Sequence, residues 1–168
     1  ILADPARSFT VRAITRPVDG VAARTLTALG TQVVAVDLDD AASLERALQG
    51  AYGVFGATND RDPCSPEREL EQVNHIARAA RRAAVRHVIW STQENTREAD
   101  SLLCNLPTTV LRTPFFWDDL IPLGMGLRRA ADGGLDFVLP MGTGRLPGIA
   151  AADIGPCALG IFQRCGQF

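Results

Sequence analysis

The chain contains no lysine, although it has 17 basic residues, all of them arginine. This absence excludes every reaction that needs a lysine amine, including Schiff-base chemistry. Acidic residues slightly outnumber basic ones, and the formal net charge is −2. Proteins that bind nucleic acid or membrane surfaces usually carry a basic face, so we expect neither kind of partner.

Cysteine is scarce and scattered, and long apolar runs are absent. The four cysteines, Cys64, Cys104, Cys157 and Cys165, show no CxxC or metal-ligand spacing. We therefore expect reduced thiols in a cytoplasmic protein, and no metal site. No apolar run approaches the roughly 18 residues of a membrane span. The first five residues lack the pattern of a signal peptide.

Residues for acid–base catalysis are also few. Tyr52 is the only tyrosine, and the two histidines are His75, inside a predicted helix, and His87, at a predicted strand start. Both histidine positions favour a structural role over a catalytic one. No serine, histidine and aspartate occur in an order with supporting motifs. The sequence therefore offers no conventional catalytic constellation.

What the sequence does contain is a regular alternation of strand and helix signals. Asp40 can cap one helix, and Ser65, Pro66 and Glu67 combine a cap, a first-turn proline and an acid at the start of another. We predict strands at 9–15, 32–36, 52–57, 87–90, 108–111 and 136–139, and helices at 20–29, 41–49, 66–84, 116–131 and 153–161. The alternation predicts an α/β fold, a Rossmann-like doubly wound parallel sheet, in a single domain over residues 1–168.

In such a sheet the ligand binds at the carboxyl ends of the strands. Polar residues follow successive predicted strands: Thr15 and Arg16, Asp37, Thr58 and Asn59, Ser91 and Thr92, and then Arg112 and Pro114. Arg16 is the most informative of them. A guanidinium just after the second strand of a Rossmann unit can hold the 2′-phosphate of NADP, where an acid would favour the free ribose of NAD.

Each of these residues also has a simpler interpretation. Arg16 can be a solvated arginine at a strand end, although the ordered set of polar strand ends favours a binding role. Asp37 either accepts a hydrogen bond from an adenine amino group or starts a turn with Asp39 and Asp40, and the two hypotheses have equal weight. Thr58 and Asn59 either line the path of the nicotinamide-side ribose or form an Asx-turn.

Seven segments of the chain occur in an order and spacing that one known family shares. They are VRAITR (Val11–Arg16), VDLDD (Val36–Asp40), LQGAYGVFGATN (Leu48–Asn59), SPERELEQ (Ser65–Gln72), HVIWSTQEN (His87–Asn95), TTVLRTPFFWDDL (Thr108–Leu120) and AAADIGP (Ala150–Pro156). Together they resemble the NmrA-like family of atypical short-chain dehydrogenase/reductase relatives, and most closely its HSCARG-like branch.

The resemblance implies NADP(H) binding with weak or no dehydrogenase activity, and a redox-sensing role through protein partners. By position, it places Thr15 and Arg16 at the adenosine 2′-phosphate, and Asp37 and Leu38 on either side of adenine. It further implies that Thr58 and Asn59 line the path toward nicotinamide. Pro114 and Phe115 would lie near the nicotinamide pocket, and Ser91 belongs to the same row of strand ends.

Two features of the family have no counterpart here. Residues Ile1–Pro5 resemble the end of the helix that follows the family's first strand, so that strand and its glycine-rich, pyrophosphate-binding loop are absent. The helix between the fifth and sixth strands is also mostly absent. We therefore expect the 168 residues not to form one continuous native chain, with segments lost before Ile1 and near Ala99–Asp100. We also expect the strand at 9–15 not to pair directly with the strand at 52–57.

Three functions remain open at this stage. The first is a regulator that binds a nicotinamide dinucleotide and acts on a protein partner. The second is an NADP-dependent reductase of a quinone or another small electrophile. The third is an interaction module without cofactor, which the absent glycine loop favours.

Overall fold

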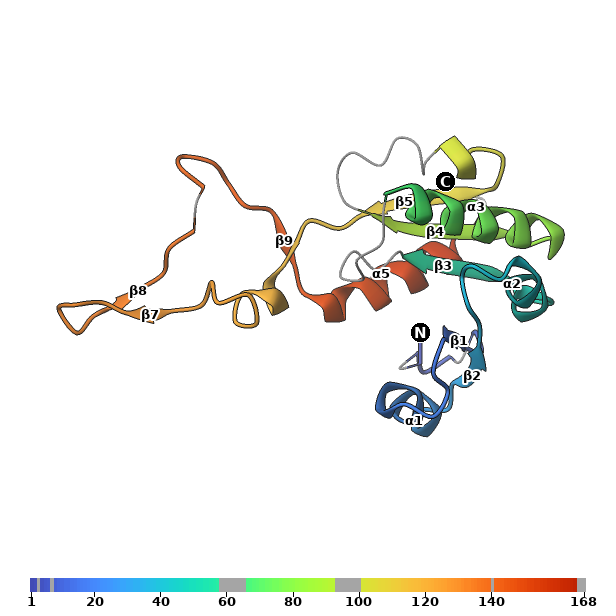
Figure 1. Cartoon of the computed structure of the whole chain (residues 1–168), viewed down its shortest axis with the longest axis horizontal. Helices are drawn as coiled ribbons and strands as arrows, with labels where there is room; N and C mark the ends of the chain where they lie inside the picture. Colours follow the sequence, from blue (N-terminus) through green and yellow to red (C-terminus); the bar gives the residue numbers. More distant parts are fainter. Residues whose placement is uncertain (3, 7, 58–65, 93–100, 140, 166–168) are drawn as a thin grey trace.

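The computed structural model describes residues 1–2, 4–6, 8–57, 66–92, 101–139 and 141–165. Strands and helices alternate through the first two thirds of the chain, and short strands follow before the last helix (Figure 1). The elements are β1 (Arg12–Thr15), α1 (Val21–Ala28), β2 (Gln32–Ala35), α2 (Ala41–Leu48), β3 (Gly53–Ala57), α3 (Pro66–Arg82), β4 (His87–Thr92), β5 (Thr108–Arg112), β6 (Phe115–Phe116), η1 (Trp117–Asp119), β7 (Arg128–Arg129), β8 (Leu135–Asp136), β9 (Gly148–Ile149) and α5 (Ala151–Gln163).

Local chemistry explains where α2 and α3 begin and how they join. The Asp40 carboxylate accepts hydrogen bonds from the backbone N–H groups of Ala42, at 3.0 Å, and Ser43, at 3.1 Å, which makes it the predicted N-cap of α2. In α3, acids occupy the first turn and arginines the last, as the helix dipole favours. Arg82 of α3 forms an ion pair with Glu45 of α2, at the surface of the packed pair.

The main strands are parallel, but they form two separate ladders within the described residues. β1 pairs with β2, from Arg12 opposite Gln32 to Thr15 opposite Ala35, and β3, β4 and β5 form a second sheet in that order. Figure 1 shows β1 and β2 set apart from β3. The expected lack of direct pairing between β1 and β3 is therefore confirmed for the described residues. Ala99 and Asp100 lie outside the described residues.

Contacts join the two ladders at the starts of β1 and β3. Phe9, just before β1, lies against Tyr52, just before β3, with ring centroids 5.4 Å apart. The Arg12 side chain at the start of β1 donates to the backbone oxygen of Gln49, 3.2 Å away, shortly before β3. The amino ends of β1 and β3 are therefore neighbours, and Thr15 and Ala57, at the carboxyl ends of the two strands, line one cavity.

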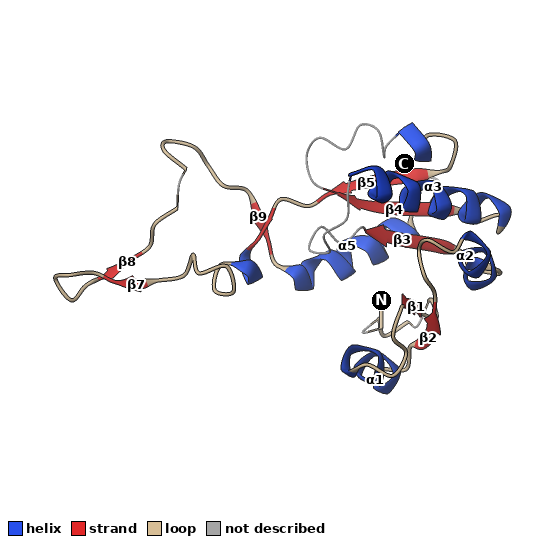
Figure 2. Cartoon of the chain, in the orientation of Figure 1, coloured by secondary structure: helices blue, strands red, loops and turns tan. Residues whose placement is uncertain are grey.

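Helices cover both faces of the three-stranded sheet, as the doubly wound prediction requires (Figure 2). Side chains alternate between the faces along β4. Val88 and Trp90 belong to the core formed with α2 and α3, whereas Ile89 packs with Ala158 and Phe162 of α5. Because β4 is buried on both faces, its sequence is continuously apolar from Val88 to Trp90, as expected for a central parallel strand.

The second half of the chain departs from the sequence prediction. Residues 116–131 were expected to form a helix but contain β6, the single 3-10 turn η1, further turns and β7. Gly124 adopts a positive φ of 68° in this stretch, which an α-helix does not allow. Of the strand expected at 136–139, only Asp136 belongs to a strand, as the second residue of β8. This segment between β6 and β9 extends away from the body of the molecule (Figure 1).

The start of α5 is also corrected. Asp153 was expected to cap this helix, but α5 begins at Ala151, and Asp153 lies in its first turn. A carboxylate oxygen of Asp118, from η1, accepts a hydrogen bond from the N–H of Ala151 at 2.7 Å. The carboxylate that accepts from the first N–H group of α5 is therefore distant in sequence, and no local sequence pattern identifies it.

His87, at the start of β4, is the basis of a prediction for stability. The side chain is 5% exposed, its Nε2 lies 2.8 Å from the Thr109 hydroxyl, and its burial lowers the pKa of the imidazole. The unfolded chain then binds the proton more readily than the folded one. We expect the free energy of unfolding to be constant above about pH 6.5 and to fall as the pH drops below it.

Urea titrations at several pH values between about 5 and 8 test this expectation. His87→Gln should flatten the dependence below about pH 6.5, because the variant lacks the group that gains a proton on unfolding. An unchanged slope in His87→Gln would show that other groups cause the dependence.

Two further expectations can be compared with the described residues. None of the described helices is long and apolar enough to cross a membrane. Cys104 and Cys157 are exposed free thiols and Cys165 is a half-buried one, while Cys64 lies outside the described residues.

Candidate functional site

A large hollow lies where the sheet divides. Its volume is about 1260 Å³. Residues of β1 and of β3 line it, together with residues of α2. Thr15, Arg16, Leu38 and Ala57 lie on its lining. All four stand at or just after the carboxyl ends of their strands, so they mark one rim of the hollow, the edge at which sheets of this type bind ligands.

The backbone places Thr15 and Arg16 at this rim. The carbonyl oxygen of Thr15 accepts a hydrogen bond from the N–H of Val36 at 3.1 Å, which anchors the end of β1 to the chain leaving β2. Thr15 is half-buried and Arg16 is exposed. Pro17 follows and cannot continue the ladder as a donor. Arg16 thus follows an anchored strand end, is exposed and belongs to the lining of the hollow.

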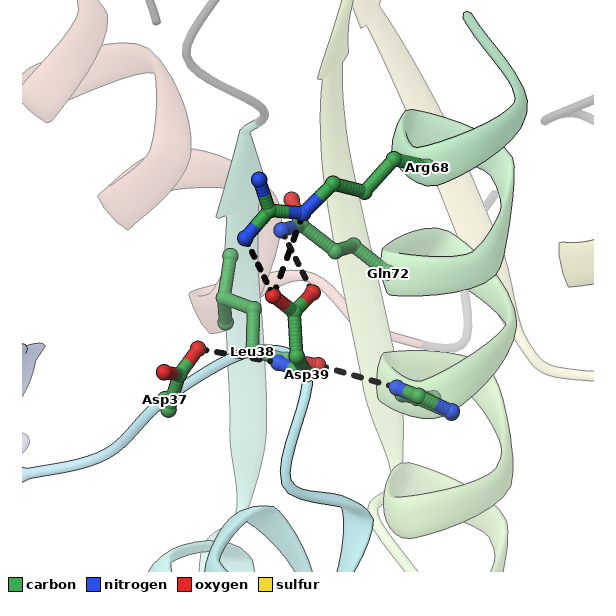
Figure 3. A network of polar contacts seen from close by, with 6 residues as sticks. Asp37, Leu38, Asp39, Arg68 and Gln72 are labelled. Carbon is green, nitrogen blue, oxygen red and sulfur yellow. Dashed lines mark hydrogen bonds and ion pairs between the residues drawn. The ribbon is translucent and has the colours of Figure 1, made fainter. Parts of the chain in front are cut away.

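The loop after β2 is held in place by α3 (Figure 3). The Asp39 carboxylate accepts from the Arg68 guanidinium, with Nε at 3.1 Å, and from the Gln72 amide at 2.9 Å. The hydrogen bond from Arg68, followed by that from Gln72, lowers the pKa of Asp39. Nδ1 of His75, one turn further along α3, donates to the carbonyl oxygen of Leu38 at 2.9 Å. Three side chains of α3 thus hydrogen-bond to the loop after β2.

Asp37 forms a turn with Asp39 and Asp40, which is one of the two hypotheses for this residue. Its carboxylate accepts from the N–H of Asp39 at 3.1 Å, and its carbonyl oxygen accepts from the N–H of Asp40 at 3.0 Å. The side chain is exposed. The turn is therefore real, and contact of Asp37 with adenine stays a prediction.

The remaining predicted site residues are not gathered at the rim. Ser91 lies within β4, in register with Ala57 and Leu111. Phe115 belongs to β6, which pairs with β9, and its ring lies 5.8 Å from that of Trp117. Ser91, Pro114 and Phe115 are all absent from the lining of the hollow. Thr58 and Asn59 fall outside the described residues.

Sequence reasoning missed the residues that position the loop. Arg68 and Gln72 stand four apart on α3 and so share one helix face, but that spacing is common on solvated helices. Their acceptor, Asp39, is 29 and 33 residues away in sequence. In the described ranges no group of three or more histidine, cysteine or carboxylate side chains is placed to hold a metal ion.

Tyr52 does not occupy the position of a catalytic base. It precedes β3 and so lies at the amino end of the sheet, opposite the rim. Its ring lies against Phe9, and the Arg86 guanidinium is 5.9 Å from the ring centroid. Burial, and then Cys165, raise the pKa of its hydroxyl above 10.0. A phenol with a raised pKa is almost wholly protonated at neutral pH and is a poor base.

We therefore expect no alcohol oxidation of the short-chain dehydrogenase type. With NADP and a panel of secondary alcohols, the chain should show no turnover above the uncatalysed rate. Tyr52→Phe should leave any slow residual rate unchanged. Turnover at a rate typical of enzymes, abolished by Tyr52→Phe, would contradict this expectation.

The fold and the position of the rim define a Rossmann-like α/β protein with a candidate nucleotide site at its strand ends. The sequence profile of the NmrA-like family matches residues 1–108, and the chain belongs to this family.

Two curated relatives illustrate the range of proteins it resembles. The chain is 32% identical over 105 residues to the NmrA-like family domain-containing oxidoreductase himF of Aspergillus japonicus, covering 61% of this chain and 32% of that protein. It is 26% identical over 165 residues to an NAD(P)H azoreductase of Xenophilus azovorans, covering 89% of this chain and 54% of that protein. The chain thus spans about a third to a half of these relatives.

Among solved structures, the chain is similar to NmrA, described as a negative transcriptional regulator. The TM-score is 0.81 at 21% identity, and the match covers 96% of this chain and 57% of NmrA. NmrA has also been solved in complex with NAD and in complex with NADP. This similarity establishes the Rossmann-like fold.

Proposed function

We propose that the chain is a single Rossmann-like domain, over residues 1–168, that binds NADP(H) at the rim formed by the ends of β1, β2 and β3. Its role is that of a redox-sensing regulator that signals to a protein partner and has little or no dehydrogenase activity. The free thiols in the described part of the chain agree with a cytoplasmic location.

The observation that carries the proposal is the convergence of Thr15, Arg16 and Leu38 on one cavity. An arginine at this point favours a 2′-phosphate, because a guanidinium offers paired N–H donors and a permanent charge. The adenine ring would lie over the loop of Asp37 and Leu38, which α3 holds through Asp39 and His75. The binding of NAD and NADP by NmrA supports a nicotinamide dinucleotide as the ligand.

Thr58, Asn59, Ser91, Pro114 and Phe115 complete the proposed site on the nicotinamide side. Ser91 lies near the end of β4, in register with Ala57 of the cavity lining, and Pro114 and Phe115 follow β5 in the same three-stranded sheet. The position of Tyr52 before β3, at the amino end of the strand, supports a regulator rather than a dehydrogenase.

A second candidate is an NADP-dependent reductase of a quinone or another small electrophile. The similarity to an NAD(P)H azoreductase over 89% of this chain favours it. Such a reaction transfers a hydride from the reduced nicotinamide to the electrophile, which takes up a proton as well. It needs no tyrosine–lysine pair on the protein.

One experiment separates the candidates. NADPH is titrated into the purified chain while nicotinamide fluorescence is followed, and NADPH oxidation is then measured with a panel of quinones and azo dyes. Saturable binding without oxidation supports the regulator, and binding with oxidation identifies the reductase. If NADPH does not bind at millimolar concentrations, both the regulator and the reductase are refuted, and the interaction module without cofactor is the remaining hypothesis.

A further inference from the structure

The loop after β2, residues 37–40, contacts the hollow on one side and α3 on the other. The Leu38 side chain lies on the lining of the hollow and packs against the core formed with α2 and α3. The carbonyl oxygen of Leu38 accepts a hydrogen bond from Nδ1 of His75 at 2.9 Å. Ile76, the next residue of α3, is buried and also belongs to the lining. The place of Leu38 at the rim therefore depends on where α3 holds this loop.

Asp39 fixes the loop through its side chain and its backbone together (Figure 3). Its carboxylate accepts from Nε of Arg68 at 3.1 Å and from the Gln72 amide at 2.9 Å. Its N–H donates to the Asp37 carboxylate at 3.1 Å. Neither Asp39 nor its two partners on α3 belong to the lining of the hollow. These three residues therefore reach the rim through Asp37 and Leu38, which they hold in place.

The donors of α3 stand on a rigid support. Arg68, Gln72 and His75 are separated by four and three residues, so they share one face of the helix. Another face carries Val73 and Ile76, which are buried in the core. A side chain on a packed helix is positioned more precisely than one on a loop. The helix therefore sets the position of the loop.

We infer that Arg68 and Gln72 are positioning residues for the adenine side of the dinucleotide site, and that they act through Asp39 on the loop that carries Asp37 and Leu38. This role rests on the proposed function, in which adenine binds over this loop. The network lies outside the cavity and holds the loop in one conformation before a dinucleotide binds. A loop ordered in advance loses less conformational entropy on binding, so the network raises affinity without contacting the ligand.

The charges in the network separate a positioning role from a purely electrostatic one. Arg68→Ala removes a positive charge from the neighbourhood of an anionic ligand, whereas Asp39→Ala removes a negative one. If the two residues acted through their charges alone, Arg68→Ala would weaken binding and Asp39→Ala would strengthen it. Because they hold the loop, both substitutions should weaken binding, since each breaks the same ion pair.

The test measures dissociation constants of NADP and NAD by calorimetry for the unaltered chain, the two single variants and the double variant that combines them. We expect about three- to fivefold weaker binding in Arg68→Ala. Asp39→Ala also loses the contact with Gln72, and its binding should be about five- to tenfold weaker. The double variant should bind within about twofold of Asp39→Ala, because losses of one shared contact do not multiply.

Arg82→Ala is the matched control. Arg82 also lies on α3 and forms an exposed ion pair, but its partner is Glu45 of α2. The substitution removes the same charge as Arg68→Ala, and dinucleotide affinity should stay within about twofold of the unaltered chain. Circular dichroism and urea titrations verify that each variant is folded.

Two further measurements locate the effect on the adenine side. Adenosine 2′,5′-bisphosphate, which lacks the nicotinamide half, should lose affinity in Arg68→Ala by the same factor as NADP. The ratio of the NADP and NAD affinities should stay unchanged in this variant, which distinguishes Arg68 from Arg16. A loss confined to NADP would assign Arg68 to the 2′-phosphate and overturn its positioning role.

Hydrogen exchange gives a readout that needs no ligand. The N–H groups of Asp39 and Asp40 bond to Asp37 in the folded loop, so their exchange should be faster in Arg68→Ala and unchanged in Arg82→Ala. Unchanged exchange in Arg68→Ala would overturn the inference, as would tighter dinucleotide binding in Asp39→Ala or losses that multiply in the double variant. If the unaltered chain binds no dinucleotide, the proposed function fails, and this inference fails with it. If it binds and Arg68→Ala binds equally well, the positioning role alone is refuted.

Discussion

Replacing Arg16 with alanine should weaken NADP binding by about ten- to a hundredfold and leave NAD binding within about twofold of its original strength. The reason is the charge-assisted contact between guanidinium and 2′-phosphate, worth about 1.5–3 kcal/mol, which NAD cannot make. The unaltered chain should accordingly prefer NADP. Dissociation constants for the two dinucleotides, measured by calorimetry in the same buffer, report the effect.

The matched control is Arg78→Ala, which removes an exposed arginine from α3, away from the hollow. It lowers the net charge by the same amount, so it corrects for general attraction of the phosphates. The dinucleotide titrations should be repeated at two salt concentrations, because screening weakens long-range attraction most. Equal affinities for NADP and NAD in the unaltered chain would refute the role of Arg16, as would equal effects of the two substitutions.

Replacing Trp90 with alanine should destabilise the fold by about 3–5 kcal/mol. Trp90 lies on β4 with 1% of its surface exposed, at the centre of the core shared with α2 and α3. Its indole lies directly over Gly56 on β3, where a Cβ atom would come within 2.6 Å of the ring. The substitution leaves a large cavity in the core that Trp90 shares with residues of α2 and α3. Since native domains are stable by only about 5–15 kcal/mol, much of that stability would be lost.

Trp117→Ala provides the comparison, since Trp117 is 41% exposed and lies outside the main sheet. We expect it to cost less than about 1.5 kcal/mol, and urea titrations followed by far-ultraviolet circular dichroism measure both losses. If Trp90→Ala does not fold, Trp90→Phe, which removes less volume, should give an intermediate loss. Equal losses for the two alanine variants would contradict the assignment of Trp90 to the centre of the core.

The elements of the sheet could be predicted because their signals are local. The cap at Asp40 and the acids and arginines at the two ends of α3 act within one helical turn, and the structure confirms both helices. The buried strand β4 is recognisable from its apolar run. The false helix at 116–131 arose from the same kind of signal. Leu120, Leu123 and Leu127 have helical spacing, but turns containing Gly124 replace the helix.

The candidate site could be predicted only in part. Thr15 and Arg16 were identified by their position at a strand end and Leu38 by the family resemblance, and all three line the cavity. Ser91, also named as a strand end, and Phe115, named from the resemblance, do not line that cavity, because position along a strand does not determine which strand edges are adjacent. The contacts of Asp39 with Arg68 and Gln72 had no sequence signal at all.

By itself, the sequence determined the alternation of strands and helices, the family, and the row of polar strand ends that points to a dinucleotide. These depend on side-chain preferences and spacings that act over a few residues. The tertiary structure alone decided which strand ends line one cavity, and that α3 holds the loop after β2. Such features depend on contacts between residues dozens of positions apart, whose free energy is set by packing of the whole fold rather than by any local pattern.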